Sequence, residues 1–360
     1  GVTPVSMPGL WKQAPGMLLD PEGPLTIRWQ HLLKIAPWLF RFMRAGKRQR
    51  VEQHAHALAS LVRTSLHDYQ QITRETGLES MIQPSPMLAV FGSREQFERD
   101  PYGWDLRKRN GVEWDTLEGA DVQDFEPSLA ERFGFALALK NTGFALDPQQ
   151  LAHGLYETYM KRGGNFVTTE VRSISIEGVQ PRLLTASGTL NANRVVIAAG
   201  ARSALLSRTL GENVPLQQER GYHITLSGYS GTAPRYPIMS PAHKVIATPM
   251  ACGLRIAGMV EFGGFLPPNH KRGDILRGQL NELFPRVHGG TPSSWMGHRP
   301  TLPDSLPVIA QSMRQPSVYY AFGHQHVGLT CAPMTARLIG ELIAGETPSV
   351  DIRPFRVNRF

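Results

Sequence analysis

An arginine near the end of the chain has the side-chain chemistry and the neighbours that a carboxylate-binding site requires. Arg299 stands in the run Gly-His-Arg-Pro, with no acidic residue before Asp304. A guanidinium offers two parallel donors to two carboxylate oxygens, and its charge does not titrate near neutral pH. The sequence therefore indicates either a carboxylate anchor at Arg299 or a structural arginine that bridges loops at the surface. Asp304 is expected to pair with a neighbour or cap a turn.

A strand, a turn with two glycines and a helix follow this arginine. Val318 to Phe322 is a β-rich run, residues 323–328 form the turn, and Ala332 to Ala344 has helical apolar spacing. Gly345 with Pro348 beyond it is an ordinary helix stop. This order aims backbone N–H groups at an anion or an electron-rich ring. An ordinary strand-to-helix crossover has the same pattern, so both interpretations stay open.

Together these two motifs resemble a known flavin signature. Gly-His-Arg-Pro-Thr-Leu-Pro-Asp-Ser-Leu-Pro-Val-Ile at 297–309 and Phe-Gly-His-Gln-His-Val-Gly-Leu-Thr at 322–330 are similar to the C-terminal motifs of the D-amino-acid oxidase superfamily. Within it, essentially the whole chain looks most like bacterial D-amino-acid dehydrogenases and their D-hydroxyproline-oxidising relatives. The resemblance implies an FAD enzyme that oxidises a D-amino acid, such as D-alanine or D-proline, and passes electrons to a quinone or dye. The imino-acid product would then hydrolyse.

The resemblance also implies roles for individual residues. Arg299 would bind the substrate carboxylate, Tyr222 would close over the substrate, and His326 would contact the substrate or the flavin edge. A core tyrosine and a hydrogen-bonded turn histidine are the structural alternatives. Tyr222 and His223 alternate along a strand, so only one of them can face the site. The residues implied to contact FAD are Val171, Ala199, Gly200, Gly297, Gly323, His324, Gly328, Leu329 and Thr330. Backbone N–H groups of the last turn would face the flavin edge where negative charge develops on reduction.

Other site chemistries lack their motifs in this sequence. Cys252 and Cys331 are far apart and give no metal-ligand spacing, so no metal site is predicted. Gly-x-Ser-x-Gly does not occur, which argues against a hydrolase. The alternatives that remain are a glycine/sarcosine-type amine oxidase of the same fold and a non-catalytic chain that needs another subunit.

Composition and charge narrow the class of protein. The chain has 360 residues, 41% of them hydrophobic, which is enough for two domains with their own cores. A net charge of +8 favours anionic partners such as substrate carboxylates, FAD phosphates or acidic lipid. Nucleic acid is not favoured, because no zinc spacing, helix-turn-helix signal or RNA-binding motif accompanies the charge. We expect a cytoplasmic protein that can lie at the inner face of the cytoplasmic membrane.

The predicted fold class is mixed α/β, with a Rossmann-like FAD-binding domain interleaved with an antiparallel-sheet substrate domain. The first would comprise residues 1–76, 143–212 and 297–350, the second residues 77–142 and 213–296, with a tail at 351–360. The all-apolar run Val195 to Ala199 predicts a strand buried on both faces. The resemblance places this strand and the following Ala-Gly-Ala beside the FAD.

The start of the chain departs from the usual order of FAD enzymes. Such enzymes open with a strand, Gly-x-Gly-x-x-Gly and a helix. That fingerprint is not found here, and the resemblance begins with Pro8-Gly-Leu-Trp and the run from Leu18 to Leu25. We therefore expect the first nucleotide-binding unit to be missing from the chain as given.

Five local predictions concern elements around these motifs. Residues 24–50 are basic and aromatic, and Pro37 is expected to break them into two pieces that lie on an anionic membrane or pack as a helix pair. Residues 52–76 read as one helix. Asp147 and Pro148 read as the start of another. Residues 117–127 read as a solvated acidic loop, and residues 165–169 as a strand.

Overall fold

The computed structural model describes residues 1–20, 22–178, 180–264 and 266–360. The helices are α1 (Leu10–Leu19), α2 (Trp29–Ala45), α3 (Arg48–Val62), α4 (Ser65–Thr76), α5 (Arg94–Phe97), α6 (Pro101–Arg109), α7 (Ala120–Phe125), α8 (Pro148–Lys161), α9 (Ser203–Thr209), α10 (Lys271–Leu283) and α11 (Gly328–Ala344). Short 3-10 turns are η1 (Glu79–Met81), η2 (Gly200–Arg202), η3 (Arg353–Phe355) and η4 (Val357–Arg359).

In the described part of the chain the strands belong to four sheets, of which two matter for the site. Within the described residues, a nine-stranded sheet has the order β15-β11-β14-β13-β12-β3-β5-β4, with β1 on β14, and a three-stranded sheet has the order β10-β17-β16. The strands are β1 (Leu25–Ile27), β2 (Ile82–Pro84), β3 (Met87–Phe91), β4 (Trp114–Glu118), β5 (Phe135–Leu139), β6 (Gly143–Ala145), β7 (Val171–Glu177), β8 (Gln180–Thr185), β9 (Gly188–Asn191), β10 (Val195–Ile197), β11 (Gln217–Gly231), β12 (Ile238–Ser240), β13 (Val245–Met250), β14 (Gly253–Phe262), β15 (Val287–Thr301), β16 (Val308–Gln311) and β17 (Val318–Phe322).

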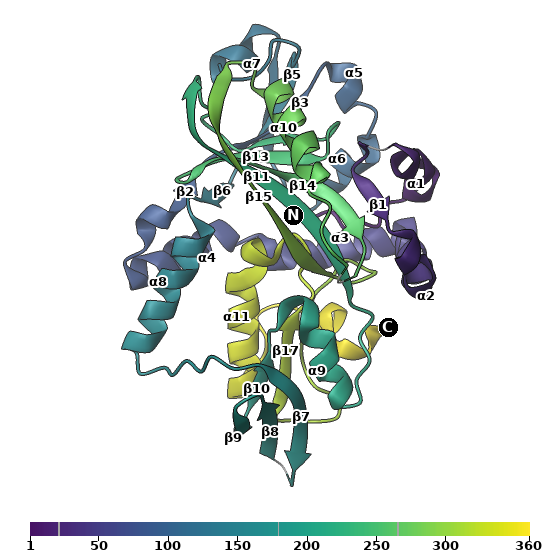
Figure 1. Ribbon diagram of the computed structural model, residues 1–360, viewed down its shortest axis with the longest axis vertical. Coiled ribbons are helices and arrows are strands. Elements are labelled where there is room, and N and C mark those ends of the chain that lie inside the picture. The colour runs from purple at the N-terminus through teal and green to yellow at the C-terminus, as the bar shows by residue number, and fades with distance from the viewer. Residues whose placement is uncertain (21, 179, 265) are drawn as a thin grey trace.

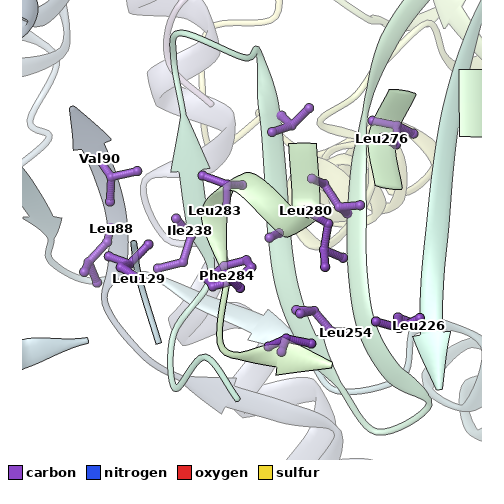
Figure 2. Close-up of a cluster of buried hydrophobic side chains, with 14 of the residues drawn as sticks. Leu88, Val90, Leu129, Leu226, Ile238, Leu254, Leu276, Leu280, Leu283 and Phe284 are labelled. Carbon is purple, nitrogen blue, oxygen red and sulfur yellow. The ribbon is translucent and has the colours of Figure 1, made fainter. Parts of the chain in front are cut away.

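Helix α10 covers one face of the large sheet at β11, β13 and β14, whereas α5 and α6 pack on the opposite face farther along the sheet, at β3 and β5. Leu276, Leu280 and Leu283 of α10 recur at helical spacing and pack on apolar side chains of β11, β13 and β14, as Figure 2 shows. Because side chains alternate along a strand, the residues between these core positions point to the other face. That second face, near the long β11–β15 pair, lies above the α11 region in Figure 1.

The three-stranded sheet places β10 and β17 parallel to each other, with Val195 opposite Val318. The strand predicted at 318–322 is confirmed, and α11 ends at Gly345 as predicted but begins at Gly328, earlier than the apolar spacing suggested. Val195 and Ile197 are buried, whereas Val196 is 41% exposed. The prediction of a strand buried on both faces is therefore wrong, because the face of β10 that carries Val196 is exposed to solvent.

Two helix predictions need correction. Pro37 does not break its segment, because α2 runs unbroken for 17 residues. Pro37 has no N–H to donate to the carbonyl of Leu33. Because Leu33 is 88% exposed, water can hydrogen-bond to that carbonyl instead. The single helix predicted over 52–76 is instead α3 and α4. Thr64 leaves helical geometry and donates to Asp68 Oδ2 at 2.6 Å, a local hydrogen bond that competes with the helix.

One loop prediction and one strand prediction are also wrong, whereas one predicted helix cap is confirmed. Residues 117–127 contain the end of β4 and all of α7, and Glu126 within them is fully buried, accepting from the backbone N–H groups of Ser128, Arg235 and Tyr236. Residues 165–169 form no strand. Asp147 caps α8 by accepting from two backbone N–H groups, with Pro148 following. The domain boundaries given above stay a prediction.

A buried ionic cluster ties the large sheet to α2 and to the loop after β14. Glu261 accepts from Arg28, Arg220 and the Tyr222 hydroxyl, and both Glu261 and Arg220 are almost fully buried. We expect Glu261→Gln to lower the free energy of unfolding by about 2 kcal/mol, because Arg220 then loses a charged acceptor. Chemical denaturation measures this. The matched control is Glu118→Gln at the exposed Arg94–Glu118 pair, which should change stability by less than about 1 kcal/mol. Equal effects of the two variants would contradict this role of the cluster.

Candidate functional site

The face of β11, β13, β14 and β15 opposite α10, which we call the open face, carries the residues of the candidate site. The pairing register places them side by side on four strands. They are Ile246 of β13, Arg255 and Ala257 of β14, Gly221 and His223 of β11, and Trp295, Gly297 and Arg299 of β15. The ring of Trp295 is 58% exposed and Ile246 is exposed as well, so this face is open to solvent.

Arg299 is held by part of its guanidinium only. Its Nη1 donates to Glu219 Oε1 at 2.7 Å and to the Met259 carbonyl at 3.0 Å, while Nη2 makes a longer contact to the Gly258 carbonyl at 3.4 Å. No hydrogen bond from Nε occurs within the described residues, and the side chain is 23% exposed. Glu219 thus fixes one edge of the fork, and the Nε edge is left to bind a carboxylate.

A glycine lies directly beneath this arginine. A Cβ placed on Gly221 would lie 2.2 Å from Arg299 Cζ, so the guanidinium rests directly on the backbone of β11. A Cβ on Gly297 would lie 2.1 Å from the Trp295 ring in the same way. The two glycines let Arg299 and Trp295 lie flat on the sheet.

His223 and Trp295 make an aromatic wall next to Arg299. Their ring centroids are 5.1 Å apart with the rings nearly parallel. Burial, and then the charge of Arg255, lower the pKa of His223 to about 4, so this imidazole is neutral at pH 7. Its Nδ1 lies 3.1 Å from Arg255 Nη2 and accepts from it.

The structure does not bring Tyr222 to Arg299. Tyr222 belongs to the buried core beneath α10, on the face opposite Arg299. Its hydroxyl donates to Glu261 and accepts from the Asn269 N–H at 3.1 Å. Burial and the hydrogen bond to Glu261 raise the pKa of Tyr222. Strand alternation therefore gives His223 the position on the open face.

The glycine turn after β17 docks on the end of β15. Gln325 has a positive φ of 51° and donates through its backbone N–H to the Pro300 carbonyl at 3.1 Å, one residue from Arg299. Gly323 has φ +90°, and a Cβ there would lie 2.4 Å from Leu302 Cδ1. This packing brings His326 near Arg299. Partial loss of hydration, and then the charge of Arg299, lower the pKa of the exposed His326.

The N-terminus of α11 presents unused backbone donors. The N–H groups of Gly328, Leu329 and Thr330 make no hydrogen bond within the described residues, whereas that of Cys331 begins the helical series. Such an end carries partial positive charge and binds anions or electron-rich groups. His324 is not part of this set of free donors, because its Nε2 and Thr335 Oγ1 are hydrogen-bonded at 2.9 Å, and burial lowers its pKa to about 4.

Tyr69 holds the first turns of α11 in place. Pro333 lacks the N–H that would reach the Leu329 carbonyl, and the Tyr69 hydroxyl donates to that carbonyl at 2.7 Å. We expect Tyr69→Phe to cost about 1 kcal/mol of unfolding free energy, because the carbonyl loses its donor. In a Pro333→Ala background the restored backbone N–H can donate to the Leu329 carbonyl, so Tyr69→Phe should cost less unfolding free energy. A double-mutant cycle of unfolding free energies measures the difference, and additive effects would contradict this account.

The end of β10 lies at the same edge as this turn. β10 and β17 are parallel neighbours, so their carboxyl ends meet, which is where ligands bind in open α/β sheets. Ala199 is exposed, and η2 lies against β15. Gly200 has φ +55°, and a Cβ added there would meet no atom within 4 Å. Val171 stands at the start of β7, in the separate β7-β8-β9 sheet.

The structure thus brings most of the predicted site residues to one region. Arg299, Gly297, His326 and the turn and helix end at 323–330 lie together, with Ala199 and Gly200 at the neighbouring strand end. Sequence reasoning missed Arg255 and the role of Trp295. The alternation of Arg255 with buried Leu254 and Ile256 was the available signal. As expected, Asp304 is structural, accepting from Leu306 N–H and pairing with Arg359 at 2.7 Å.

Comparisons with known proteins identify the family and the fold of the chain. A family model described as FAD dependent oxidoreductase, DAO, matches residues 32–342. A D-amino-acid oxidase of Bradyrhizobium diazoefficiens is 36% identical over 366 residues, covering 100% of this chain and 86% of the relative. A D-amino acid dehydrogenase of Rhizobium johnstonii is 25% identical, covering 99% and 87%. Among solved structures, glycine oxidase from Geobacillus kaustophilus is 21% identical with a TM-score of 0.75, covering 84% of this chain and 83% of that one, which shows a shared fold.

Proposed function

Since this chain belongs to the DAO family of FAD-dependent oxidoreductases, we propose that it oxidises D-amino acids at Cα on the open face of its large sheet. The observation that carries the proposal is Arg299, a half-satisfied guanidinium beside the turn and helix end where an electron-rich ring can bind. The relative at 36% identity and several more distant ones bear names that specify D-amino acids.

The described residues fit the cofactor. The N–H groups of Gly328, Leu329 and Thr330 would hold the electron-rich edge of the flavin ring, and the exposed turn at Ala199 and Gly200 would allow close approach of the cofactor to the backbone. FAD, when bound, supplies an acceptor for the hydride that leaves Cα. Stabilising charge at that edge through fixed backbone donors requires no reorganisation during the reaction.

The chain's own residues bind and orient the substrate. Arg299 would take the α-carboxylate through its Nε edge, while Glu219 keeps the guanidinium from rotating. Trp295 and His223 would cover the substrate from the sheet side. His326, which is neutral at pH 7, offers a ring nitrogen near Arg299 that can accept a hydrogen bond from the amine. The amine must be neutral when hydride leaves Cα, and the imino acid formed then hydrolyses to a 2-oxo acid and ammonia.

Product analysis with both enantiomers tests this proposal. The FAD-loaded protein should convert D-alanine to pyruvate and ammonia in equal amounts when an electron acceptor is present, and L-alanine should give neither. Oxidation of glycine or sarcosine at a higher rate than D-alanine would support the amine-oxidase alternative instead. Absence of oxo acid from every D-amino acid would overturn the proposal.

We propose a quinone as the electron acceptor, reached from a membrane surface. α1 and α2 lie together at one side of the molecule in Figure 1 and expose large apolar side chains to solvent. These are Trp11, Leu18, Leu19, Trp29, Leu32, Leu33, Phe40 and Met43, which we call the α1–α2 surface. Lysines and arginines flank it, with Arg44 stacked over Phe40. Apolar side chains bordered by basic ones bind anionic lipid at the cytoplasmic face of a membrane.

No helix in the described part of the chain has the length and hydropathy to cross a bilayer. Vesicle flotation tests the peripheral contact. The protein should float with vesicles that contain anionic lipid and not with purely zwitterionic ones, and Leu33→Glu should reduce the bound fraction. Phe166→Glu, at an exposed apolar residue away from the α1–α2 surface, is the matched control. Equal loss in both variants would contradict the assignment of this surface.

Oxygen is the second candidate acceptor, because the relative at 36% identity is named an oxidase. Measuring hydrogen peroxide formation distinguishes a quinone-dependent enzyme from an oxidase. A quinone-dependent enzyme forms little peroxide and turns over faster when a soluble quinone is added. One peroxide per oxo acid, with no effect of quinone, would assign the chain as an oxidase.

A further inference from the structure

A second arginine shares the open face with Arg299. Arg255 projects from β14, and its Nη2 reaches His223 Nδ1 on β11 at 3.1 Å. The guanidinium of Arg299 lies over Gly221, two residues earlier on the same strand. A strand rises about 3.3 Å per residue, so the two guanidinium groups lie about 7 Å apart along β11. Two positive groups thus face the same space.

Arg255 is incompletely satisfied. Its Nε is buried and has no hydrogen-bond partner within the described residues, and no carboxylate there forms a salt bridge with it. Burial, and then the charge of Arg299, lower the pKa of Arg255. A buried positive charge whose hydrogen bond goes only to a neutral imidazole is unfavourable until an anion arrives.

Another arginine of the same sheet shows what a structural role looks like. Arg220 is fully buried, pairs with Glu261 and donates to the carbonyls of Gly263, Gly264 and Pro267. Each of the three guanidinium nitrogens of Arg220 donates at least one hydrogen bond. Arg255, by contrast, keeps an unused buried donor on a face that is open to solvent, which is the arrangement expected of a ligand-binding arginine.

We infer that Arg255 binds a second carboxylate of the substrate, so that the preferred substrates are acidic D-amino acids such as D-aspartate and D-glutamate. This inference rests on the proposed function. Arg299 takes the α-carboxylate, Arg255 takes the side-chain carboxylate, and His223 orients Arg255 by accepting from Nη2. A ligand with two carboxylates would give each of the two guanidinium groups a carboxylate on the open face, which a neutral side chain cannot do.

Steady-state kinetics of the FAD-loaded protein test the inference. D-aspartate and D-asparagine have nearly the same shape and differ in charge, so their ratio of kcat/KM isolates the second carboxylate. We expect the ratio to exceed about 10, because a hydrogen bond to a charged group contributes about 1.5–3 kcal/mol. Arg255→Met should bring the ratio near one, and Arg255→Lys should restore part of it. Melting curves of both variants confirm that they fold.

A binding measurement gives a readout without turnover. Succinate has the two carboxylates of aspartate and no amine, and succinamate has one carboxylate replaced by an amide. Calorimetric titration should show tighter binding of succinate to the wild-type protein and nearly equal binding of the two to Arg255→Met. A preference for succinate that persists in Arg255→Met would overturn the inference.

The outcomes separate this inference from the proposed function. If D-alanine is oxidised but D-aspartate is no better a substrate than D-asparagine, the role of Arg255 is wrong and the proposed function stands. If no D-amino acid is oxidised, the proposed function is wrong, and the succinate titration still decides whether Arg255 binds a carboxylate.

Discussion

Arg299→Met should lower kcat/KM for D-alanine by about 10³-fold while the protein keeps its FAD. Two charge-assisted hydrogen bonds to a carboxylate are worth about 4 kcal/mol, and each 1.4 kcal/mol corresponds to tenfold in rate. FAD should stay bound because Arg299 contacts Glu219 and the backbone of β14 and makes no hydrogen bond to the α11 turn. Steady-state kinetics and the flavin-to-protein ratio measure the two effects.

Structural damage must be separated from loss of the anchor. Glu219 is buried, and in Arg299→Met it would lose its guanidinium partner. Among the described residues, the Thr301 hydroxyl would then be its one remaining side-chain donor. The double variant Arg299→Met/Glu219→Gln removes that unpaired charge and should recover stability without recovering activity. Recovery of activity in the double variant, or substrate affinity that is unchanged in the single one, would show that Arg299 is not the anchor.

Gly323→Ala should destabilise the protein by up to about 5 kcal/mol and weaken FAD binding. The residue has φ +90°, which costs a side chain about 1–2 kcal/mol, and its Cβ would lie 2.4 Å from Leu302 Cδ1, an overlap that costs about 1–3 kcal/mol more. Leu302 is fully buried and Gln325 Nε2 donates to its carbonyl, so neither side can move freely. The turn and the α11 donors would shift together.

Gly345 at the other end of α11 is the matched control. It has φ +75° with no atom within 4 Å of a Cβ, so Gly345→Ala carries the backbone strain without the overlap. We expect the control to lose only about 1–2 kcal/mol and to keep its affinity for FAD. Denaturant unfolding and the dissociation constant of FAD measure both. Equal losses of FAD affinity in the two variants would mean that the contact with Leu302 does not position the turn.

The placement of the candidate site could be predicted where one local motif determines the backbone. The run around Arg299 and the turn at Gly323 each combine residue types that fix both backbone and chemistry, and the structure places them together. The helix cap at Asp147 was predictable for the same reason, because it depends on neighbouring residues. These features depend on neighbours in sequence, which a single chain displays directly.

The predictions that failed concern residues whose positions depend on contacts between segments distant in sequence. Tyr222 or His223 could face the site, and only the position of α10 decides which. The buried carboxylate of Glu126 is stabilised by N–H groups about 110 residues away, which an acidic stretch does not reveal. Arg255 looked like an ordinary strand arginine until the register placed it beside His223. Tertiary pairing overrides local pattern in each case.

The most direct test of the central claim is the visible spectrum of the FAD-loaded protein mixed anaerobically with a D-amino acid. Without an acceptor, one turnover should bleach the flavin absorbance with D-alanine or D-aspartate, L-alanine should leave it unchanged, and Arg299→Met should bleach far more slowly. Bleaching by the L-enantiomer at the same rate, or a spectrum unchanged by every D-amino acid, would contradict the claim that the open face binds and oxidises D-amino acids.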